Sequence, residues 1–207
     1  MAGAQIEMPL SASVRAVLQR SVSDMAAPKS AFSSPLEAEA WLNEMSPRLE
    51  SRLPDREYRL SFLRTVHYEA TRAGLDPQLV LGLIEVESGF NKYAVSNAGA
   101  RGYMQVMPFW VKDIGTPEHN LFHLRTNLRY GCTILRYYLG MENGDLYRAL
   151  GRYNGSLGQP QYPNAVRAAW HNHWSVPRRT SAGDNQSAVT AQRPGGCGRT
   201  GASISCS

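Results

Sequence analysis

One segment, residues 76–88, limits the possible folds more than any other part of the chain. Asp76-Pro77 is typical of a helix start, because aspartate caps free N–H groups and proline fits the first turn. The apolar residues that follow lie on almost every side of that helix; they are Leu79, Val80, Leu81, Leu83, Ile84 and Val86. A helix that is apolar all round is normally covered on all sides. We therefore expect it to be the buried centre of an all-helical domain.

The rest of the chain predicts helices that can cover this centre. Apolar residues at helical spacing, together with capping residues and prolines, predict helices over about 35–49, 55–73, 108–114, 126–140, 145–153 and 163–174. Strand patterns are nearly absent, and the Gly, Asn and Ser residues of 89–104 predict a loop or a short irregular ribbon. The expected fold class is therefore all-α.

Composition divides the 207 residues into one domain and two tails. Residues 35–176 carry the helical patterns and form the expected domain. Residues 1–34 are interpreted as a flexible N-terminal arm, with one weak amphipathic turn near Val14 and Leu18. Residues 177–207 consist mostly of Gly, Ser, Thr, Gln, Arg and Pro, which predicts a disordered tail.

The net charge argues against nucleic-acid binding once it is divided along the chain. The whole chain carries +5, but its last 33 residues hold four arginines and one aspartate, so the other 174 residues carry only +2. A nearly neutral domain lacks the basic surface that nucleic acids require. Weak attraction to an anionic polymer such as a cell wall stays compatible with this charge.

The three cysteines match no zinc pattern. Cys132 lies in a helical apolar pattern and is expected to be a small buried side chain. Cys197 and Cys206 lie in the predicted tail, where a disulfide is compatible with the sequence but is not required by it.

Glu87 is an acid at a position where the helical period calls for an apolar side chain. It shares one stripe of the central helix with Val80, Leu83 and Ile84. Burial disfavours a charged carboxylate, and so does the negative end of the helix dipole, so we expect a raised pKa for Glu87. A raised pKa suits a general acid. The alternative is a solvated last helical turn; the neighbouring Glu85 is interpreted as structural or peripheral.

A long motif begins at Glu87. The sequence runs Glu87-Ser88-Gly89-Phe90-Asn91, continues with Ala94-Val95-Ser96, and ends in Gly99-Ala100-Arg101-Gly102-Tyr103-Met104-Gln105-Val106-Met107-Pro108. It closely resembles the signature of bacterial soluble lytic transglycosylases, which reads Glu-Ser, then Phe or Trp, then Ser, then Gly-Ala-x-Gly-x-Met-Gln-x-Met-Pro. A second family motif, a Tyr-Asn pair ending a later helix, matches Tyr153-Asn154. The resemblance covers about residues 58–172.

This resemblance implies a goose-type lysozyme-like domain that cleaves the β-1,4 bond between N-acetylmuramic acid and N-acetylglucosamine in peptidoglycan. In the implied mechanism Glu87 first donates a proton to the glycosidic oxygen, and the substrate's own N-acetyl oxygen can stabilise the developing cation. The Glu87 carboxylate then takes the proton of the C6 hydroxyl, which attacks C1 and leaves a 1,6-anhydro end. Most glycosidases use two carboxylates, but the sequence has no acid between Glu87 and Asp113.

The resemblance also implies substrate-binding residues, and each has a plainer structural alternative. Ser96 would hydrogen-bond Glu87 or an N-acetyl group of the substrate, or else cap its own loop. Met104 and Met107 would form apolar walls under a saccharide, or else fill the core. Gln105 would bind N-acetyl and hydroxyl groups, or else be a surface amide.

Tyr153 and Asn154 are the site residues that the second motif implies. Tyr153 is expected to reach the reacting centre and help to hold the acid, with a buried core tyrosine as the alternative. Asn154 is expected to contact substrate, or else to end its helix before Gly155. The chain departs from the family over 161–166, where members often carry Glu-Thr-x-x-Tyr-Val and this sequence reads Gln161-Tyr162-Pro163-Asn164-Ala165-Val166.

Two other functions fit the same residues. A goose-type lysozyme would use Glu87 with water as the nucleophile. A non-catalytic module for wall binding or secretion assembly would bind glycan without turnover, although the presence of Glu87 argues against it.

The resemblance implies peptidoglycan glycan strands as the partner, envelope assembly machinery as a further one, and a monomer. It implies no metal and no organic cofactor. It also implies a location in the periplasm or cell envelope, although residues 1–28 lack the basic start and long apolar run of a secretory signal. No run of about 18 apolar residues predicts a transmembrane helix.

Overall fold

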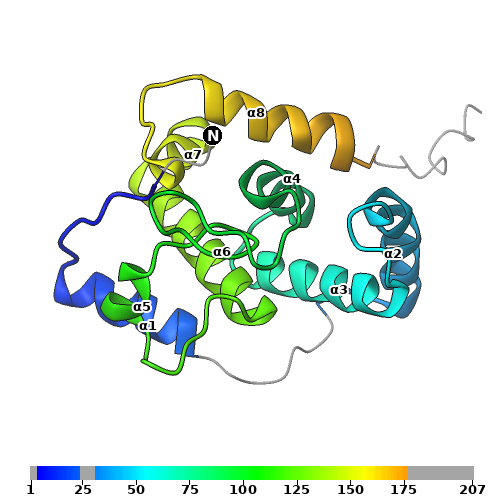
Figure 1. The fold of residues 1–207 in the computed structure, drawn as a ribbon, viewed down its shortest axis with the longest axis horizontal. Coiled ribbons are helices and arrows are strands. Elements are labelled where there is room, and N and C mark those ends of the chain that lie inside the picture. The colour runs from blue at the N-terminus through cyan, green and yellow to red at the C-terminus, as the bar shows by residue number, and fades with distance from the viewer. Residues whose placement is uncertain (1–3, 24–30, 177–207) are drawn as a thin grey trace, which may run out of the picture. The chain divides into compact units, whose positions relative to one another are not determined.

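Helices make up nearly all the regular structure in the computed structural model, which describes residues 4–23 and 31–176 (Figure 1). In chain order they are α1 (Ala12–Ser23), α2 (Pro35–Leu49), α3 (Arg56–Arg72), α4 (Pro77–Ser88), α5 (Phe109–Ile114), α6 (Leu124–Met141), α7 (Leu146–Asn154) and α8 (Gln161–Ala169), followed by a π-helical turn, η1 (Trp170–Trp174). Two isolated bridges join Val95 to Arg101 and Arg101 to Val106. The prediction of a mainly helical fold is confirmed.

Local capping explains where several helices begin. The Asp76 carboxylate accepts a hydrogen bond from the Gln78 N–H at 2.7 Å, and Pro77 fills the first turn of α4. Ser34 and Asp55 cap α2 and α3 in the same way. These three helix starts agree with the ones that the sequence predicts.

Helix α4 lies at the centre of the domain. Figure 1 shows it nearly end on, with α3 on one side and α8 on the other. Its buried residues are Leu79, Val80, Leu81, Gly82, Leu83, Ile84 and Glu87. Gly82 allows η1 to approach closely, because a Cβ atom added there would lie 2.7 Å from the backbone nitrogen of Trp170. Since that neighbour is backbone, the spacing between α4 and the C-terminal helices depends on this glycine.

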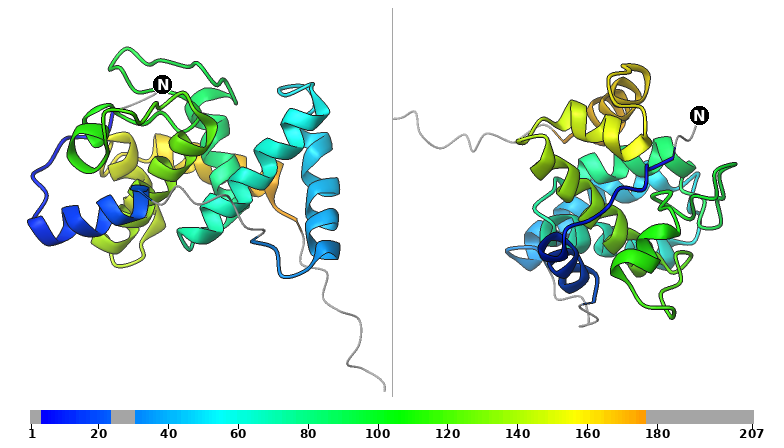
Figure 2. Two further views of the ribbon diagram at one scale, coloured as in Figure 1. Left: turned by 90° about the horizontal axis from the view of Figure 1, so that it is seen from below. Right: turned by 90° about the vertical axis from the view of Figure 1, so that its left-hand side faces the viewer.

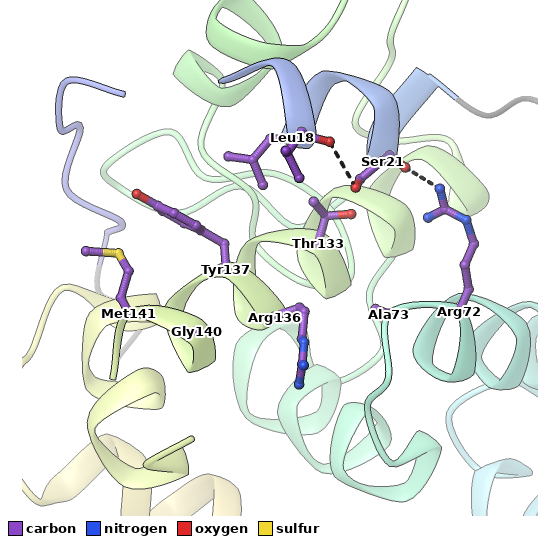
Figure 3. Close-up of a pocket in the computed structure, with 10 residues that line it drawn as sticks. Leu18, Ser21, Arg72, Ala73, Thr133, Arg136, Tyr137, Gly140 and Met141 are labelled. Atoms are coloured by element: carbon purple, nitrogen blue, oxygen red, sulfur yellow. Dashed lines mark hydrogen bonds between the residues drawn. The ribbon is translucent and has the colours of Figure 1, made fainter. Parts of the chain in front are cut away.

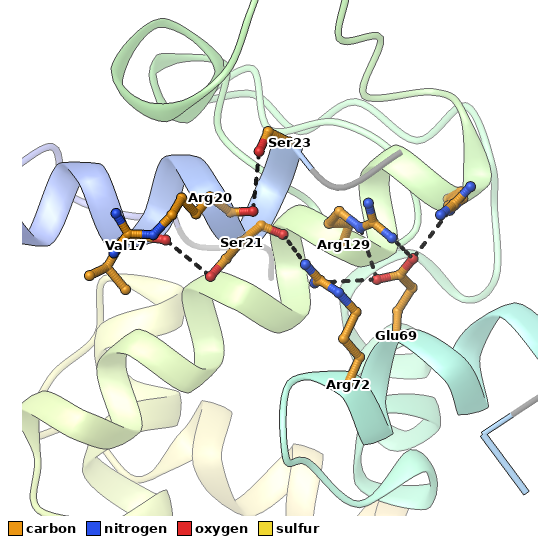
Figure 4. A network of polar contacts seen from close by, with 8 residues as sticks. Val17, Arg20, Ser21, Ser23, Glu69, Arg72 and Arg129 are labelled. Carbon is orange, nitrogen blue, oxygen red and sulfur yellow. Dashed lines mark hydrogen bonds and ion pairs between the residues drawn. The ribbon is translucent and has the colours of Figure 1, made fainter. Parts of the chain in front are cut away.

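The N-terminal region differs from the predicted flexible arm. Residues Ala12–Ser23 form a 12-residue helix that packs on α5 and α6 (Figure 2). Leu18 and Val22 are buried, and the Arg72 guanidinium donates a hydrogen bond to the Ser21 carbonyl oxygen at 2.5 Å (Figure 4). The prediction is therefore wrong for this helix. Its few apolar residues are stabilised by a surface distant in the sequence, which a local pattern does not reveal.

A buried carboxylate joins α3 to α6. Glu69 is fully buried and accepts two hydrogen bonds from Arg129, at 3.1 and 2.7 Å. Arg125 and Arg72 lie at 3.5 and 3.8 Å from the same carboxylate (Figure 4). A buried charge is tolerated where partners of opposite charge replace its hydration. This cluster therefore joins α3 to α6 through buried charges.

Cys132 is buried in α6 and its thiol is unpaired, as the sequence predicts for a small core side chain. The predicted tail over 177–207, with Cys197 and Cys206, lies outside the described residues. Of the helices that the structure describes, none is long and apolar enough to cross a membrane.

Replacing Gly82 with alanine is expected to lower the free energy of unfolding by about 1–3 kcal/mol, because the new methyl group overlaps the Trp170 backbone. Gly140→Ala in α6 is the matched control, since a Cβ atom there meets open space. Alanine favours helix more than glycine does, so the control is expected to be neutral or more stable by up to about 1 kcal/mol. Urea unfolding measures both. Equal stabilities of the two variants would contradict the close approach.

Candidate active site

Glu87 lies near the end of α4 with its carboxyl group inside the protein. The residue is only 8% exposed and shares its stripe with the buried Leu83 and Ile84. The helix ends directly afterwards, at Ser88, and Gly89 takes the left-handed conformation, with φ 56°, that turns the chain into the following loop. The carboxyl group is therefore buried, and the alternative of a solvated last turn does not hold.

Burial raises the pKa of Glu87 to about 8, while a hydrogen bond from the Tyr162 hydroxyl at 2.5 Å acts in the opposite direction. Burial is the larger effect, so the carboxyl group holds its proton at neutral pH. The pKa of Tyr162 is raised well above its ordinary value, by burial and by the Glu87 charge, so its hydroxyl stays the donor. One carboxyl oxygen is thus held by Tyr162, and the other can carry a transferable proton.

Tyr162 is the site residue that sequence reasoning missed. It lies on α8 within the stretch that departs from the family pattern, where the family tyrosine aligns with Ala165. In α8 Tyr162 is buried, whereas Ala165, nearly one helical turn later, is exposed. A tyrosine one turn before the aligned position is the signal that points to this residue.

One asparagine holds the loop after α4 against α6. Asn127 is fully buried; its side-chain oxygen accepts a hydrogen bond from the Met104 N–H at 2.8 Å. Its amide nitrogen donates to the carbonyl oxygens of Arg101 and Leu121, each at 2.8 Å. Gly102 leaves space for this side chain, because an added Cβ atom would lie 2.5 Å from the amide nitrogen. Three backbone groups are therefore positioned by a single side chain.

Gln105 has a strained backbone inside this loop. Its φ of 47° lies in the left-handed region, which residues other than glycine rarely adopt. Its buried side-chain nitrogen donates to the carbonyl oxygens of Ala94 at 3.1 Å and Gly102 at 2.9 Å. Gln105 is therefore not the surface amide of the alternative interpretation. Such strain persists where surrounding contacts hold it, and it is common at functional loops.

Met104 and Tyr153 contact each other through the Met104 backbone. The Met104 side chain is fully buried against α6, where a Cβ atom added to Gly131 would lie 2.4 Å from the Met104 sulfur. The core-filling alternative therefore describes this side chain. The buried Tyr153 hydroxyl donates to the Met104 carbonyl oxygen at 2.7 Å, and the pKa of Tyr153 is raised by burial and then by the nearby Glu87 charge. Tyr153 thus lies beside the acid while it braces the loop.

Ser96 and Met107 occupy less buried positions of the same loop. The Ser96 hydroxyl oxygen accepts a hydrogen bond from the Ala100 N–H at 3.1 Å, which is the loop-capping alternative. Met107 is partly buried, and its N–H donates to the side-chain oxygen of Gln5 at 2.9 Å. Substrate contacts by Ser96 and Met107 stay predictions.

Asn154 ends α7, but the left-handed residue that caps the helix is Gly155, with φ 73°. The Asn154 side chain is buried, and its nitrogen has no hydrogen-bond partner in the described part of the chain. Buried donors nearly always have a partner. Among the predicted substrate contacts in the described residues, this amide nitrogen is the buried side-chain atom without a hydrogen-bond partner.

A cavity of about 710 Å³ lies between α1, α3 and α6, on a part of the surface that includes none of the predicted site residues (Figure 3). Its lining consists of Val17, Leu18, Ser21, Arg72, Ala73, Thr133, Arg136, Tyr137, Gly140 and Met141. This cavity therefore does not mark the predicted active site. The buried acid and its hydroxyl partner do, because a protonated carboxyl group at neutral pH is equipped to donate a proton. Over residues 4–23 and 31–176 no group of three His, Cys, Asp or Glu side chains is arranged to hold a metal ion.

Comparison with known families assigns the class of protein. A model of the family described as "Transglycosylase SLT domain" matches residues 64–169, just over half of the 207 residues. The chain therefore belongs to the transglycosylase SLT domain family, and the resemblance seen in the sequence is confirmed. The matched range includes Glu87, the loop after α4, Tyr153 and Tyr162.

Individual relatives carry related names. The "Membrane-bound lytic murein transglycosylase C" of Actinobacillus pleuropneumoniae serotype 5b (strain L20) is 55% identical over 113 residues, which cover 47% of this chain and 31% of the relative. A "Transglycosylase" of Enterobacteria phage PRD1 is 33% identical over 103 residues, covering 50% of this chain and 38% of the relative. The chain thus spans about a third of these relatives' length. A solved structure of the lytic transglycosylase Slt from Pseudomonas aeruginosa, an inactive mutant, aligns with TM-score 0.42 and 26% identity over 57% of this chain and 19% of that one.

Glu87→Gln is expected to stabilise the fold increasingly as the pH rises. The folded protein keeps the Glu87 proton to about pH 8, whereas the unfolded chain loses it near the ordinary pKa of 4.5. Between these values the folded state binds more protons, so rising pH lowers the wild-type free energy of unfolding. The advantage of the variant is expected to grow by up to about 1.4 kcal/mol per pH unit and then level off. Urea unfolding across this pH range measures it; an advantage independent of pH would contradict the buried acid.

Proposed function

We propose that this chain is a lytic transglycosylase that cleaves the β-1,4 bond between N-acetylmuramic acid and N-acetylglucosamine in peptidoglycan, with residues 35–176 as its catalytic domain. The observation that carries the proposal is the Glu87 carboxyl group, which is buried, protonated at neutral pH and held by Tyr162. Family membership and the names of the relatives support the reaction class.

In the first step Glu87 donates its proton to the glycosidic oxygen, which leaves with the N-acetylglucosamine part of the strand. A raised pKa favours this step, because the acid must be protonated before it can donate. The Tyr162 hydroxyl then stabilises the resulting carboxylate through the hydrogen bond it already makes. The Tyr162 side chain thus lowers the free energy of the buried Glu87 carboxylate, which exists only after proton transfer.

In the second step the Glu87 carboxylate takes the proton of the C6 hydroxyl of the muramic acid. The C6 oxygen attacks C1, and a 1,6-anhydro end forms without water. The attacking oxygen is already part of the sugar, which removes the entropic cost of bringing in a second reactant. The sequence offers no acid between Glu87 and Asp113, which fits a reaction in which one carboxyl group acts twice.

Substrate contacts are assigned to the loop and to the end of α7. The Asn154 amide, with its unused donor among the described residues, is suited to a carbonyl or hydroxyl oxygen of the sugar. Met107 and Ser96 lie on the partly accessible side of the loop. Met104, Gln105 and Tyr153 act chiefly by positioning, because their side chains are buried and brace the loop.

A cell-envelope location follows from this substrate, because peptidoglycan lies outside the cytoplasmic membrane. Envelope assembly machinery, which needs gaps in the wall, is a compatible partner.

Glu87→Gln is expected to reduce the release of anhydro ends from purified peptidoglycan by at least about 100-fold, because an amide cannot donate the required proton. Glu85→Gln is the matched control, since Glu85 lies on the same helix but accepts hydrogen bonds from the Trp174 indole N–H at 2.7 Å and the His173 ring. It is expected to keep nearly wild-type activity. Mass spectrometry identifies the ends: anhydro ends support the proposal, and reducing ends, heavier by one water, indicate a hydrolase instead. Equal digestion by wild type and Glu87→Gln would refute the role of Glu87.

The pH profile of kcat/KM provides a second test. Activity is expected to fall above about pH 8, where Glu87 of the substrate-free enzyme loses its proton. Tyr162→Phe removes the hydrogen bond that lowers this pKa, so the alkaline limb is expected to move to higher pH while kcat decreases. Tyr147→Phe, which removes an exposed hydroxyl bonded to the Pro160 carbonyl oxygen, is the control and is expected to leave the limb in place. An alkaline limb that Tyr162→Phe leaves unmoved would contradict the assigned pair.

A further inference from the structure

The segment that precedes α1, residues 4–10, runs from that helix to the proposed active site (Figures 1 and 2). Gln5 is its buried residue, only 5% exposed. The Gln5 side-chain oxygen accepts a hydrogen bond from the Met107 N–H at 2.9 Å, and its nitrogen donates to the Gln105 carbonyl oxygen at 3.0 Å. One carboxamide therefore occupies two backbone groups of the loop that belongs to the family motif.

The residue directly before Gln5 lies against the second motif. A Cβ atom added to Gly155 would lie 2.0 Å from the Ala4 carbonyl oxygen. Gly155 directly follows Tyr153 and Asn154, so residues 4–10 bridge the loop after α4 and the end of α7. These are the two places to which the proposed function assigns the glycan.

The chemistry of Gln5 matches the substrate. A carboxamide presents one carbonyl acceptor and N–H donors on a planar group, and so does the acetamido group that both peptidoglycan sugars carry. A backbone N–H can donate to the carbonyl oxygen of either group. A secondary acetamido group is trans, so its N–H points away from its carbonyl and does not reach the neighbouring Gln105 carbonyl oxygen as well. Gln5 therefore occupies the Met107 N–H in the way that the carbonyl oxygen of an N-acetyl group would.

The segment is held less firmly than the helix behind it. Ile6 is 62% exposed and Met8 is 38% exposed, and a small cavity of about 70 Å³ lies beside them, between the segment and Arg152. Helix α1, in contrast, is anchored by the buried Leu18 and Val22. Residues 4–10 can therefore lift from the loop while α1 stays in place.

We propose that residues 4–10 are a self-blocking strap, in which Gln5 occupies the Met107 N–H that would otherwise bind the carbonyl oxygen of a substrate acetamido group. The inference rests on the proposed function, because it assumes that glycan binds at this loop. Glycan and strap compete for the same backbone N–H, so the apparent affinity for glycan is lower to the extent that the strap is closed.

The test uses the full chain carrying Glu87→Gln, which prevents turnover, and the trimer of N-acetylglucosamine as the probe. Gln5→Ala removes both strap hydrogen bonds and is expected to tighten binding about tenfold, as two ordinary hydrogen bonds allow. Glu7→Gln, in the exposed part of the same strap, is the matched control and is expected to change affinity less than twofold. Isothermal titration calorimetry measures all three proteins. Equal affinities of Gln5→Ala and its parent would overturn the strap.

A second probe and a second variant test which chemical group of the glycan competes with Gln5. The trimer of glucosamine, which lacks acetyl groups, is expected to gain little from Gln5→Ala; an equal gain for both trimers would overturn the acetamido position. Gln5→Glu keeps the shape of the side chain but replaces its donor with a second acceptor, so it is expected to open the strap as alanine does. Circular dichroism checks that the alanine variant is folded. If it is not, Gln5→Glu still tests the strap.

Turnover separates failure of the strap from failure of the function. With Glu87 intact, Gln5→Ala is expected to digest peptidoglycan about tenfold faster than wild type at low substrate. If the two digest at equal rates, the strap proposal fails and the proposed function stands. If neither protein binds the trimer or digests peptidoglycan, both proposals fail.

Discussion

The structure depends on keeping one carboxyl group out of water beside one hydroxyl group. Glu87 is the acid that a nearly all-apolar helix carries into the interior, and Tyr162 is the group that makes its ionised form tolerable. Neither residue achieves this alone. Burial without a donor would strongly oppose ionisation, and a donor without burial would leave an ordinary acid. The packing of α8 and η1 on α4 brings the two groups together.

The loop after α4 is held in place by hydrogen bonds from side chains to its backbone. Asn127 binds two of its backbone groups, Ser88 donates a hydrogen bond to the Tyr103 carbonyl oxygen at 2.7 Å, and Tyr153 binds the Met104 carbonyl oxygen. Much of the conspicuous motif therefore serves to shape a backbone instead of presenting side chains. A backbone held in this way exposes N–H and C=O groups at defined positions, which is how a protein recognises amide groups without charged residues.

Local sequence rules predict the helices and the acid well, because caps, prolines and apolar spacing are local signals. Asp76-Pro77 starts α4, and Glu87 is buried as its stripe predicts. Contacts between distant segments are not encoded in this way. The packing of α1 on α6, the burial of Met104 against Gly131 and the approach of Tyr162 to Glu87 depend on three-dimensional proximity. Ser96 accepts a hydrogen bond from the Ala100 N–H, a contact within its own loop, and its predicted contact with the acid or substrate stays a prediction.

Gly82 has a consequence for how the site tolerates change. Where it meets Trp170, two backbones face each other without an intervening side chain. Backbone atoms have no rotamers, so their separation does not adapt when neighbouring residues are repacked. Mutational drift on the outer surface of α8 therefore leaves the distance across this contact unchanged. The spacing between Glu87 and Tyr162 depends on the same packing of the C-terminal helices on α4. Substitutions on the exterior therefore have little effect on this pair.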